Sequence, residues 1–394
     1  MALIRVVFAA ALLASTALIT ACGGESAGGR FKRYTVNGVT MIENPARVDA
    51  PVTLRLSDSV WRDIGGVQEV ADNEFNHRNG FLTGVALKNG GLAVIDWMRV
   101  RLFDSSGTQT AVVGREGRGP GEFFGLTWIC AMAGDTVLVY DQQRRVSKIS
   151  PSGVLVNQAA VPDMSTPSGG CFDDGSFVTQ AFSRTSSLDV RNVAAERRGA
   201  DGVVVDTVGI LPVYYFTGVS QYVGLKMHGQ FVYVSDPRKN EVHRYRMDGA
   251  LNQVLRMADE ARAISAEDAQ FILGGPVAAM GSAPDAEPAP KVKDATWPFY
   301  KSIRVDRDGR LWIEDFPLDE NAPDRWTAYD STGAAVGTLL LPRGPRRAVP
   351  NSPPGAPATM PGSVPEFVDA FGDFVILLER DEDGAAHFRT RKMR

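Results

Sequence analysis

Histidine and acidic side chains are the candidates for metal-dependent chemistry in this chain. Its only histidines are His77, His228, His243 and His387, and no two have the spacing with which one helix binds zinc. Residues 306–309 and 381–384 read Asp-Arg-Asp-Gly and Asp-Glu-Asp-Gly, but neither run continues to the other ligand positions of an EF-hand. Asp-Gly also makes tight turns, which is the simpler interpretation. The pattern predicts no metal ion and no cofactor.

Motifs for nucleophilic catalysis and nucleotide binding are missing from the sequence. There is no Gly-x-Ser-x-Gly elbow and no Walker loop, and the glycines at 117, 119 and 121 are too closely spaced for a dinucleotide fingerprint. The 42 basic and 46 acidic residues give a net charge of −4, with no basic stripe that could follow phosphates. We assign no catalytic residue, leave enzymatic activity open and do not expect nucleic acid as a partner.

Arginine and aromatic side chains are the candidates for ligand contact. Arg115 and Arg118 lie in a glycine-rich segment, Tyr214 begins a Tyr-Tyr-Phe run, and Trp297 and Tyr300 bound a Trp-Pro-Phe-Tyr run. The aromatic rings could stack on a glycan, a peptide or another flat ligand beside the arginines. The alternative is that these rings pack between parts of the fold.

The N-terminus has the pattern of a signal peptide. Arg5 precedes an apolar run from Val6 to Ile19, which is shorter than the roughly 20 residues that span a bilayer. The run ends in Ile19-Thr20-Ala21-Cys22, which resembles the lipobox of bacterial lipoproteins. The resemblance implies cleavage before Cys22, diacylglycerol on its sulfur and an acyl chain on its freed amine. An uncleaved anchor and an ordinary signal peptide are the alternatives.

The chain after this signal divides into a tether and a large folded domain. Residues 22–35 are rich in glycine and are expected to form a flexible tether, with the folded domain at 36–394. Positions 23 and 24 are not acidic, which by resemblance to other lipoproteins favours the outer membrane. Membrane association through the lipid is therefore the expected localisation.

A glycine-marked turn followed by a β-rich run recurs along the folded domain and predicts repeated hairpins. The glycines of these first turns are Gly91, Gly134, Gly175, Gly229, Gly309 and Gly372. A second set of turns follows the first five, at Gly107, Gly153, Gly202, Gly249 and Gly333. The second turns are 46, 49, 47 and 84 residues apart, which matches four-stranded propeller blades of about 40 to 50 residues, with an insertion after the fourth.

The sixth repeat ends at Arg394 before a fourth strand, so another segment must complete the ring. The N-terminal residues 52–56 alternate in polarity and could supply that strand, and residues 39–42 are a second candidate. Closure removes sheet edges that would otherwise pair with other chains. We therefore predict an all-β, six-bladed β-propeller of four-stranded antiparallel blades, closed by an N-terminal strand.

Cys130 and Cys171 each stand four residues before a first-turn glycine, so they occupy matching sites on neighbouring inner strands. An exported protein can form disulfides, and neighbouring inner strands approach one another near the axis. The two cysteines are therefore a candidate disulfide pair. Two small buried thiols are the alternative.

Residues 113–123, Val-Gly-Arg-Glu-Gly-Arg-Gly-Pro-Gly-Glu-Phe, resemble the connection between blades in NHL-repeat and bacterial six-bladed β-propeller lipoproteins. Residues 326–330 and 337–342 resemble the penultimate blade of the same group. The resemblance implies the fold but no single activity, because relatives include lactonases, a peptide-amidating lyase and binding platforms. We expect a binding or scaffold module for a protein, glycan or small molecule in the cell envelope; the alternative is a metal-dependent hydrolase or lyase.

Two insertions, at about 258–294 and 343–365, fall in connections between blades and must share one rim of the propeller with Arg115 and Arg118. The first contains Ser-Ala-Glu-Asp at 265–268, a capping pattern that predicts one short helix. Long loops on a rigid scaffold often carry function, so we expect recognition on this rim. Neutral insertion is the alternative.

Changing Cys22→Ser should move the protein from the membrane fraction to the soluble fraction and abolish labelling by radioactive fatty acid. The reason is that stable anchoring needs at least two acyl chains, which only a lipidated cysteine would supply here. A Cys22→Ser protein that still incorporates fatty acid would contradict the lipid assignment.

Overall fold

The structure, a computed structural model, describes most of the folded domain. The described residues are 31–50, 53–66, 75, 82–161, 166–182, 190–216, 219–221, 224–236, 239–263, 296–316, 322–342, 347–348, 359–360, 365–382 and 384–394.

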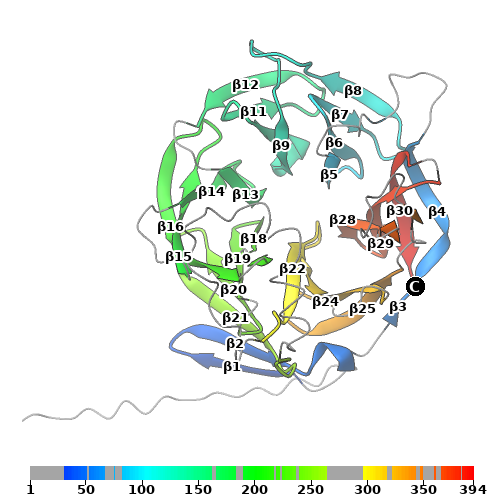
Figure 1. Ribbon diagram of the computed structural model, residues 1–394. Coiled ribbons are helices and arrows are strands. Elements are labelled where there is room, and N and C mark those ends of the chain that lie inside the picture. The colour runs from blue at the N-terminus through cyan, green and yellow to red at the C-terminus, as the bar shows by residue number, and fades with distance from the viewer. Residues whose placement is uncertain are drawn as a thin grey trace, which may run out of the picture.

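The described strands form a six-bladed β-propeller in which antiparallel sheets surround one axis (Figure 1). This confirms the predicted fold class. Each blade runs from an inner strand beside the axis to an outer strand at the perimeter. The inner strands are β5 (Leu82–Ala86), β9 (Leu126–Ala131), β13 (Thr166–Cys171), β18 (Leu225–His228), β22 (Tyr300–Val305) and β28 (Glu366–Phe371).

The remaining strands complete each blade. The second strands are β6 (Leu92–Asp96), β10 (Val137–Asp141), β14 (Phe177–Phe182), β19 (Phe231–Asp236), β23 (Leu311–Asp315) and β29 (Phe374–Arg380). The third strands are β7 (Arg99–Phe103), β11 (Arg145–Ile149), β15 (Val190–Arg198), β20 (Glu241–Arg246), β24 (Asp324–Tyr329) and β30 (Ala386–Met393). The outer strands are β8 (Gln109–Val113), β12 (Leu155–Ala160), β16 (Val204–Phe216), β21 (Leu251–Met257), β25 (Ala335–Leu341) and β4 (Leu56–Gly65).

Glycines with positive φ make the turns that set this repeat. All five glycines of the second turns adopt φ between 78° and 92°, a region that side chains with a Cβ rarely enter. The first-turn glycines also have positive φ, between 49° and 82°, except in blade 1, where Gly90 and not Gly91 has the positive φ. The recurring glycines of the sequence therefore mark turn positions whose backbone needs a positive φ.

The N-terminal part of the chain closes the ring, as predicted, but through a different segment. Strand β4 pairs antiparallel with β30 and supplies the outer strand of blade 6 (Figure 1). The predicted segment 52–56 reaches this pairing only at its end, where Arg55 and Leu56 pair with Arg394 and Met393, because β3 (Thr53–Leu54) pairs parallel with β25. The other predicted segment was wrong: β2 (Val39–Asn44) pairs parallel with β21. Alternation of polar and apolar residues predicts a strand but does not identify the strand with which it pairs. The sequence therefore could not distinguish between these segments as closing strands.

The N-terminal segment also pairs with outer strands of blades 4 and 5 before β4 closes the ring. Strand β1 (Lys32–Val36) forms a hairpin with β2, so ordered structure begins before the expected boundary at residue 36. The 3₁₀ turn η1 (Arg47–Asp49) then places Arg47 between blades 4 and 5, where it is 4% exposed. Its guanidinium contacts Asp315 at 2.6 Å and Asp259 at 3.2 Å, and donates to the Phe299 carbonyl at 2.6 Å. Buried charge is tolerated here because it is fully paired.

The core consists of hydrophobic clusters between blades, and each pair of neighbouring blades shares one. Blades 5 and 6, for example, pack Trp312 and Trp326 against Phe367, with ring centroids 5.1 Å and 4.8 Å apart. Both faces of each blade are covered in this way, so the inner and second strands are apolar on both sides. The side chains near the axis are therefore fixed by packing.

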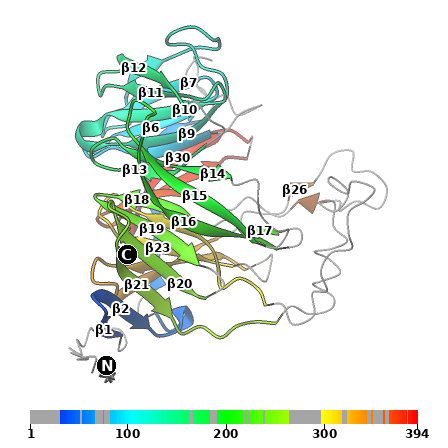
Figure 2. The same cartoon turned by 90° about the vertical axis from the view of Figure 1, so that its left-hand side faces the viewer.

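The two rims of the propeller differ. The loop rim carries the connections from each outer strand to the next inner strand, and the hairpin rim carries the turns from inner to second strand and from third to outer strand within each blade. On the loop rim, β17 (Val219–Gln221) and β26 (Arg347–Ala348), which pairs with β27 (Thr359–Met360), project from the same side of the ring (Figure 2). The predicted helix after Ser265 lies outside the described residues. The hairpin rim carries the 3₁₀ turn η3 (Ala133–Asp135).

Candidate functional site

A cavity of about 530 Å³ lies at the axis of the ring, lined by all six inner strands and several of their hairpins. Among the described residues, each inner strand pairs with one strand only, the second strand of its own blade. Its other edge faces the axis, where backbone N–H and C=O groups can bind a polar molecule. A cavity of this size is typical of small-molecule sites.

Two contacts cross between non-adjacent blades at the hairpin-rim end of this cavity. The ammonium of Lys88 in blade 1 lies 3.6 Å from the carboxylate of Asp173 in blade 3. Arg307 of blade 5 donates to the Leu87 carbonyl of blade 1 at 2.6 Å, and its guanidinium lies over the Phe371 ring of blade 6. These contacts narrow the cavity toward the hairpin rim.

Lys226 on β18 is an amine in the wall of the cavity. In the part of the chain that the structure describes, no acceptor lies within hydrogen-bonding distance of its Nζ. Burial, together with the positive charge of Arg304 on the next inner strand, lowers the pKa of Lys226 to about 7. At neutral pH this amine therefore exists in both protonation states.

Asp369 on β28 is a carboxyl group in the same wall. Burial, assisted by the nearby Asp306 carboxylate, raises the pKa of Asp369 to about 7, although backbone N–H donors oppose the shift. The donors are Ala370 at 2.7 Å and Arg307 at 3.2 Å. A partly buried acid and a partly buried amine thus share one cavity, and the pKa of each is shifted to about 7.

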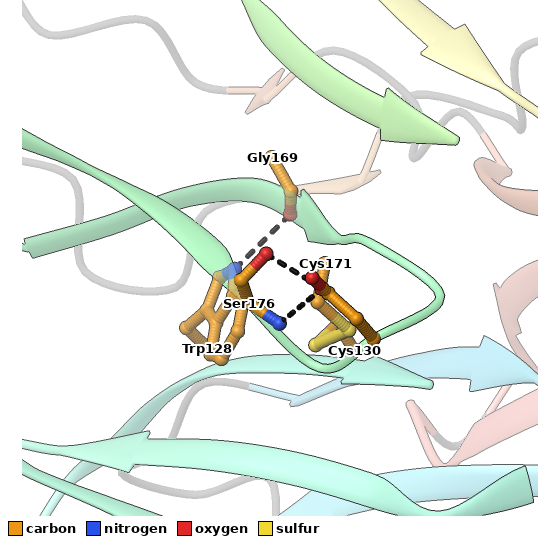
Figure 3. The surroundings of a disulfide bond; sticks show 6 residues. Trp128, Cys130, Gly169, Cys171 and Ser176 are labelled. Carbon is orange, nitrogen blue, oxygen red and sulfur yellow. Dashed lines mark hydrogen bonds between the residues drawn. A yellow bond between two sulfur atoms is a disulfide. The ribbon is translucent and has the colours of Figure 1, made fainter. Parts of the chain in front are cut away.

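A disulfide joins Cys130 and Cys171 in the wall between blades 2 and 3, with Cα atoms 5.8 Å apart (Figure 3). Next to it, Trp128 donates from Nε1 to the Gly169 carbonyl at 3.0 Å. The bond closes a loop of 41 residues, for which chain entropy predicts about 4 kcal/mol of stabilisation. The cysteine pair proposed from the sequence is the pair that the structure bonds.

Arg115 and Arg118 lie in the β8–β9 connection and do not line the cavity. Arg115, whose side chain is 80% exposed, contacts Glu122 at 2.9 Å. The same carboxylate accepts from the backbone N–H groups of Arg118 and Gly119. The Gly119 N–H and the Arg115 guanidinium hold the pKa of Glu122 below its usual value. Glu122 therefore organises this loop internally.

Trp297 and Tyr300 also lie outside the cavity lining. Tyr300 is 2% exposed and donates to the Glu241 carbonyl at 2.6 Å, which places it in the packing between blades 4 and 5. Trp297 packs against Phe316 with centroids 5.3 Å apart. Tyr214 pairs with Gln221 in the β16–β17 hairpin, and its side chain lies outside the described part. The structure does not bring Trp297 and Tyr300 together with Arg115 and Arg118 at the cavity.

Three of the four histidines are described, and His77 lies outside the described residues. His243 contacts Glu241 at 2.8 Å, and His387 contacts Asp63 at 2.7 Å and Asp381 at 3.2 Å. His228 lines the cavity, and burial lowers its pKa. Among the described residues, no group of three or more histidine, cysteine, aspartate or glutamate side chains is arranged to hold a metal ion.

The architecture and the axial cavity define the chain as a six-bladed β-propeller with a polar channel site. No family model and no curated relative matches the sequence. A candidate exported protein from Bacteroides fragilis NCTC 9343 is similar in structure, with a TM-score of 0.52 and 13% identity over 90% of this chain and 99% of that chain. At this identity the likeness supports the fold alone.

Other solved structures are more distant. A gluconolactonase from Xanthomonas campestris has a TM-score of 0.39 and 13% identity, covering 86% of this chain and all of that chain. A calcium-binding regucalcin from Agrobacterium tumefaciens has a TM-score of 0.34 and 11% identity, covering 86% and 97%. Within the described residues, no helix is long and apolar enough to cross a membrane.

Replacing the cavity amine should change stability with a specific pH dependence. The folded-state pKa of Lys226 lies below that of an unfolded lysine, so folding of the protonated form is penalised. Lys226→Met should therefore raise the melting temperature most below pH 7, and the gain should shrink as pH rises from 7 toward 10.5. A relief of about 1 kcal/mol corresponds to roughly 1–2 °C in a chain of this size.

Thermal unfolding of both proteins between pH 6 and pH 10 tests this, with Lys392→Met at an exposed position as the matched control. The control should shift by less than about 0.5 kcal/mol at every pH. If Lys226→Met were as unstable as wild type, or less stable, at pH 6, the cavity would not penalise the charged amine.

Proposed function

We propose that this chain is an exported, lipid-anchored binding protein of the cell envelope that holds a small polar molecule in its axial cavity. The observation that carries the proposal is the cavity itself, at the point where six inner strands converge. Packing between blades fixes its wall, so the binding groups are ordered before a ligand arrives. Such preorganisation reduces the entropic cost of binding.

The chemistry of the wall supports a polar ligand. Lys226, Arg304 and Asp369 come from three consecutive inner strands, and His228 adjoins them at the end of β18. The free edges of the inner strands add backbone donors and acceptors. A few converging polar groups in a concave site are what orient a small molecule.

The anchor at Cys22 and an outer-membrane location remain part of this proposal. A tether of eight residues separates Cys22 from Phe31 at the start of the described chain, and such a segment can extend by about 3.5 Å per residue. The blade 4 side of the ring, which carries β1 and β2, would then lie near the membrane (Figure 1). The metal-dependent hydrolase or lyase alternative has no described ligand set to argue from.

Filling the cavity should abolish ligand binding. Gly170 lines it, and a Cβ there would meet the Met227 carbonyl oxygen at 3.3 Å, a close contact that needs a shift of a few tenths of an ångström. We expect Gly170→Leu to fold with this adjustment, as its circular dichroism spectrum would show, and to place its side chain in the space that a ligand needs. The full-length protein, solubilised in detergent, would be screened by thermal shift against small polar metabolites. Compounds that raise the wild-type melting temperature should leave Gly170→Leu unchanged.

The double variant Arg115→Ala and Arg118→Ala distinguishes the cavity from the loop rim. It should respond to the same compounds as wild type, because neither arginine lines the cavity. Compounds that shift Gly170→Leu but not the double arginine variant would place the site on the loop rim. The absence of any stabilising compound would contradict the small-ligand function.

A further inference from the structure

Three charged residues lie at one level of the cavity wall. Aligning the registers of the inner hairpins places five residues at equivalent positions around the axis, and in blade 3 a bulge interrupts this register. Blades 1 and 2 carry apolar or sulfur side chains there, and blades 4 to 6 carry charges. The five residues are Val85, Cys130, Lys226, Arg304 and Asp369.

Side chains at this level point toward the following blade. Cys130 of blade 2 bonds Cys171 of blade 3, and Arg304 of blade 5 approaches Glu366 of blade 6. Lys226 of blade 4 is therefore directed toward blade 5, which agrees with the effect of Arg304 on its pKa. Two cations of adjacent blades thus lie side by side in the wall of the cavity.

This pair is incompletely neutralised. Lys226 has no partner among the described residues, and Arg304 has only Glu366, at 3.5 Å with the glutamate side chain 51% exposed. The other charges of the wall are engaged: Lys88 with Asp173, Asp306 with Arg310 and Trp312, Arg307 with the Leu87 carbonyl, and Asp369 with backbone N–H groups. His228, at the end of β18, faces Asp306 and Asp173.

We propose that the anionic head group of the ligand, a carboxylate or a phosphate, binds between Lys226 and Arg304. This inference rests on the proposed function and adds the chemical class of the ligand. A guanidinium beside an ammonium offers directed donors to anionic oxygens, and charge-assisted hydrogen bonds of this kind are strong in a sheltered cavity. The anion supplies the negative charge that the wall lacks.

Binding of the anion is coupled to protonation of Lys226. An anion beside the amine favours its charged form, so the ligand raises the pKa of Lys226 from about 7 and binding takes up a proton near neutral pH. Affinity therefore falls as pH rises, in the range where the free amine loses its proton. Asp369 in the same wall also loses its proton near pH 7 and then repels an anion, so the part of the pH dependence that Lys226→Met removes is the part due to the amine.

Isothermal titration of the full-length protein in detergent, at constant ionic strength, tests the inference with three probes. The probes are succinate, its neutral diamide succinamide, and inorganic phosphate. Succinate or phosphate should bind, and succinamide should not. The Kd for succinate should be roughly 25-fold higher at pH 8.5 than at pH 6.5, because the protonated fraction of an amine with a pKa of about 7 falls by about that factor.

Variants separate the two cations from the rest of the protein. Lys226→Met and Arg304→Met should each weaken succinate binding by at least about tenfold, as expected for loss of a charge-assisted contact. Lys301→Met is the matched control, since Lys301 lies on the same strand as Arg304, pairs with Glu314 and does not line the cavity. It should bind like wild type.

The outcomes distinguish this inference from the proposed function. If succinamide bound as well as succinate, or if neither anion bound, the anionic class would be overturned. Equal binding by Lys226→Met and wild type would also overturn it. If Gly170→Leu bound succinate as tightly as wild type, the cavity itself would not be the site, and the proposed function would fail as well.

Discussion

The convergence of six inner strands on one axis is the constraint on which the rest of the structure depends. Each inner strand pairs on one side only, and packing between blades leaves small, apolar or bonded side chains along most of the channel. The Cys130–Cys171 disulfide and the antiparallel pairing of β4 with β30 hold this convergence. Charges placed at the axis are therefore confined, and confinement gives Lys226 and Asp369 their shifted pKa values.

Sequence reasoning predicted the repeat because the repeat is local. The glycines of the second turns require positive φ, and such a requirement can be recognised without knowing the fold. The cysteine pair was also predictable, since Cys130 and Cys171 have the same offset from their turns. The closing strand was not predictable. Residues 39–44 and 53–54 show the same alternation of polar and apolar residues as strand β4, but they pair parallel with the outer strands of blades 4 and 5. Which strand becomes a neighbour depends on the whole ring.

The candidate site was harder to find, because it is a property of the closed ring. Long loops and two arginines led the sequence analysis to predict recognition on the loop rim. In the structure Arg115 instead contacts Glu122, the carboxylate that organises the same loop. A signal was present in the sequence: Lys226 and Asp369 each stand three residues before a first-turn glycine, within strands that are otherwise largely apolar. Only the register of the hairpins shows that Arg304, five residues before Gly309, shares their level.

The central claim is that the axial cavity holds an incompletely neutralised amine that an anion completes. The most direct measurement is an NMR titration of the Lys226 side chain in protein labelled with ¹³C-lysine, assigned by comparison with Lys226→Met, with and without succinate. The account predicts a pKa near 7 without ligand and a clear increase when succinate is bound. A lysine that titrates near 10.4 in both samples, as a fully solvated amine does, would contradict it.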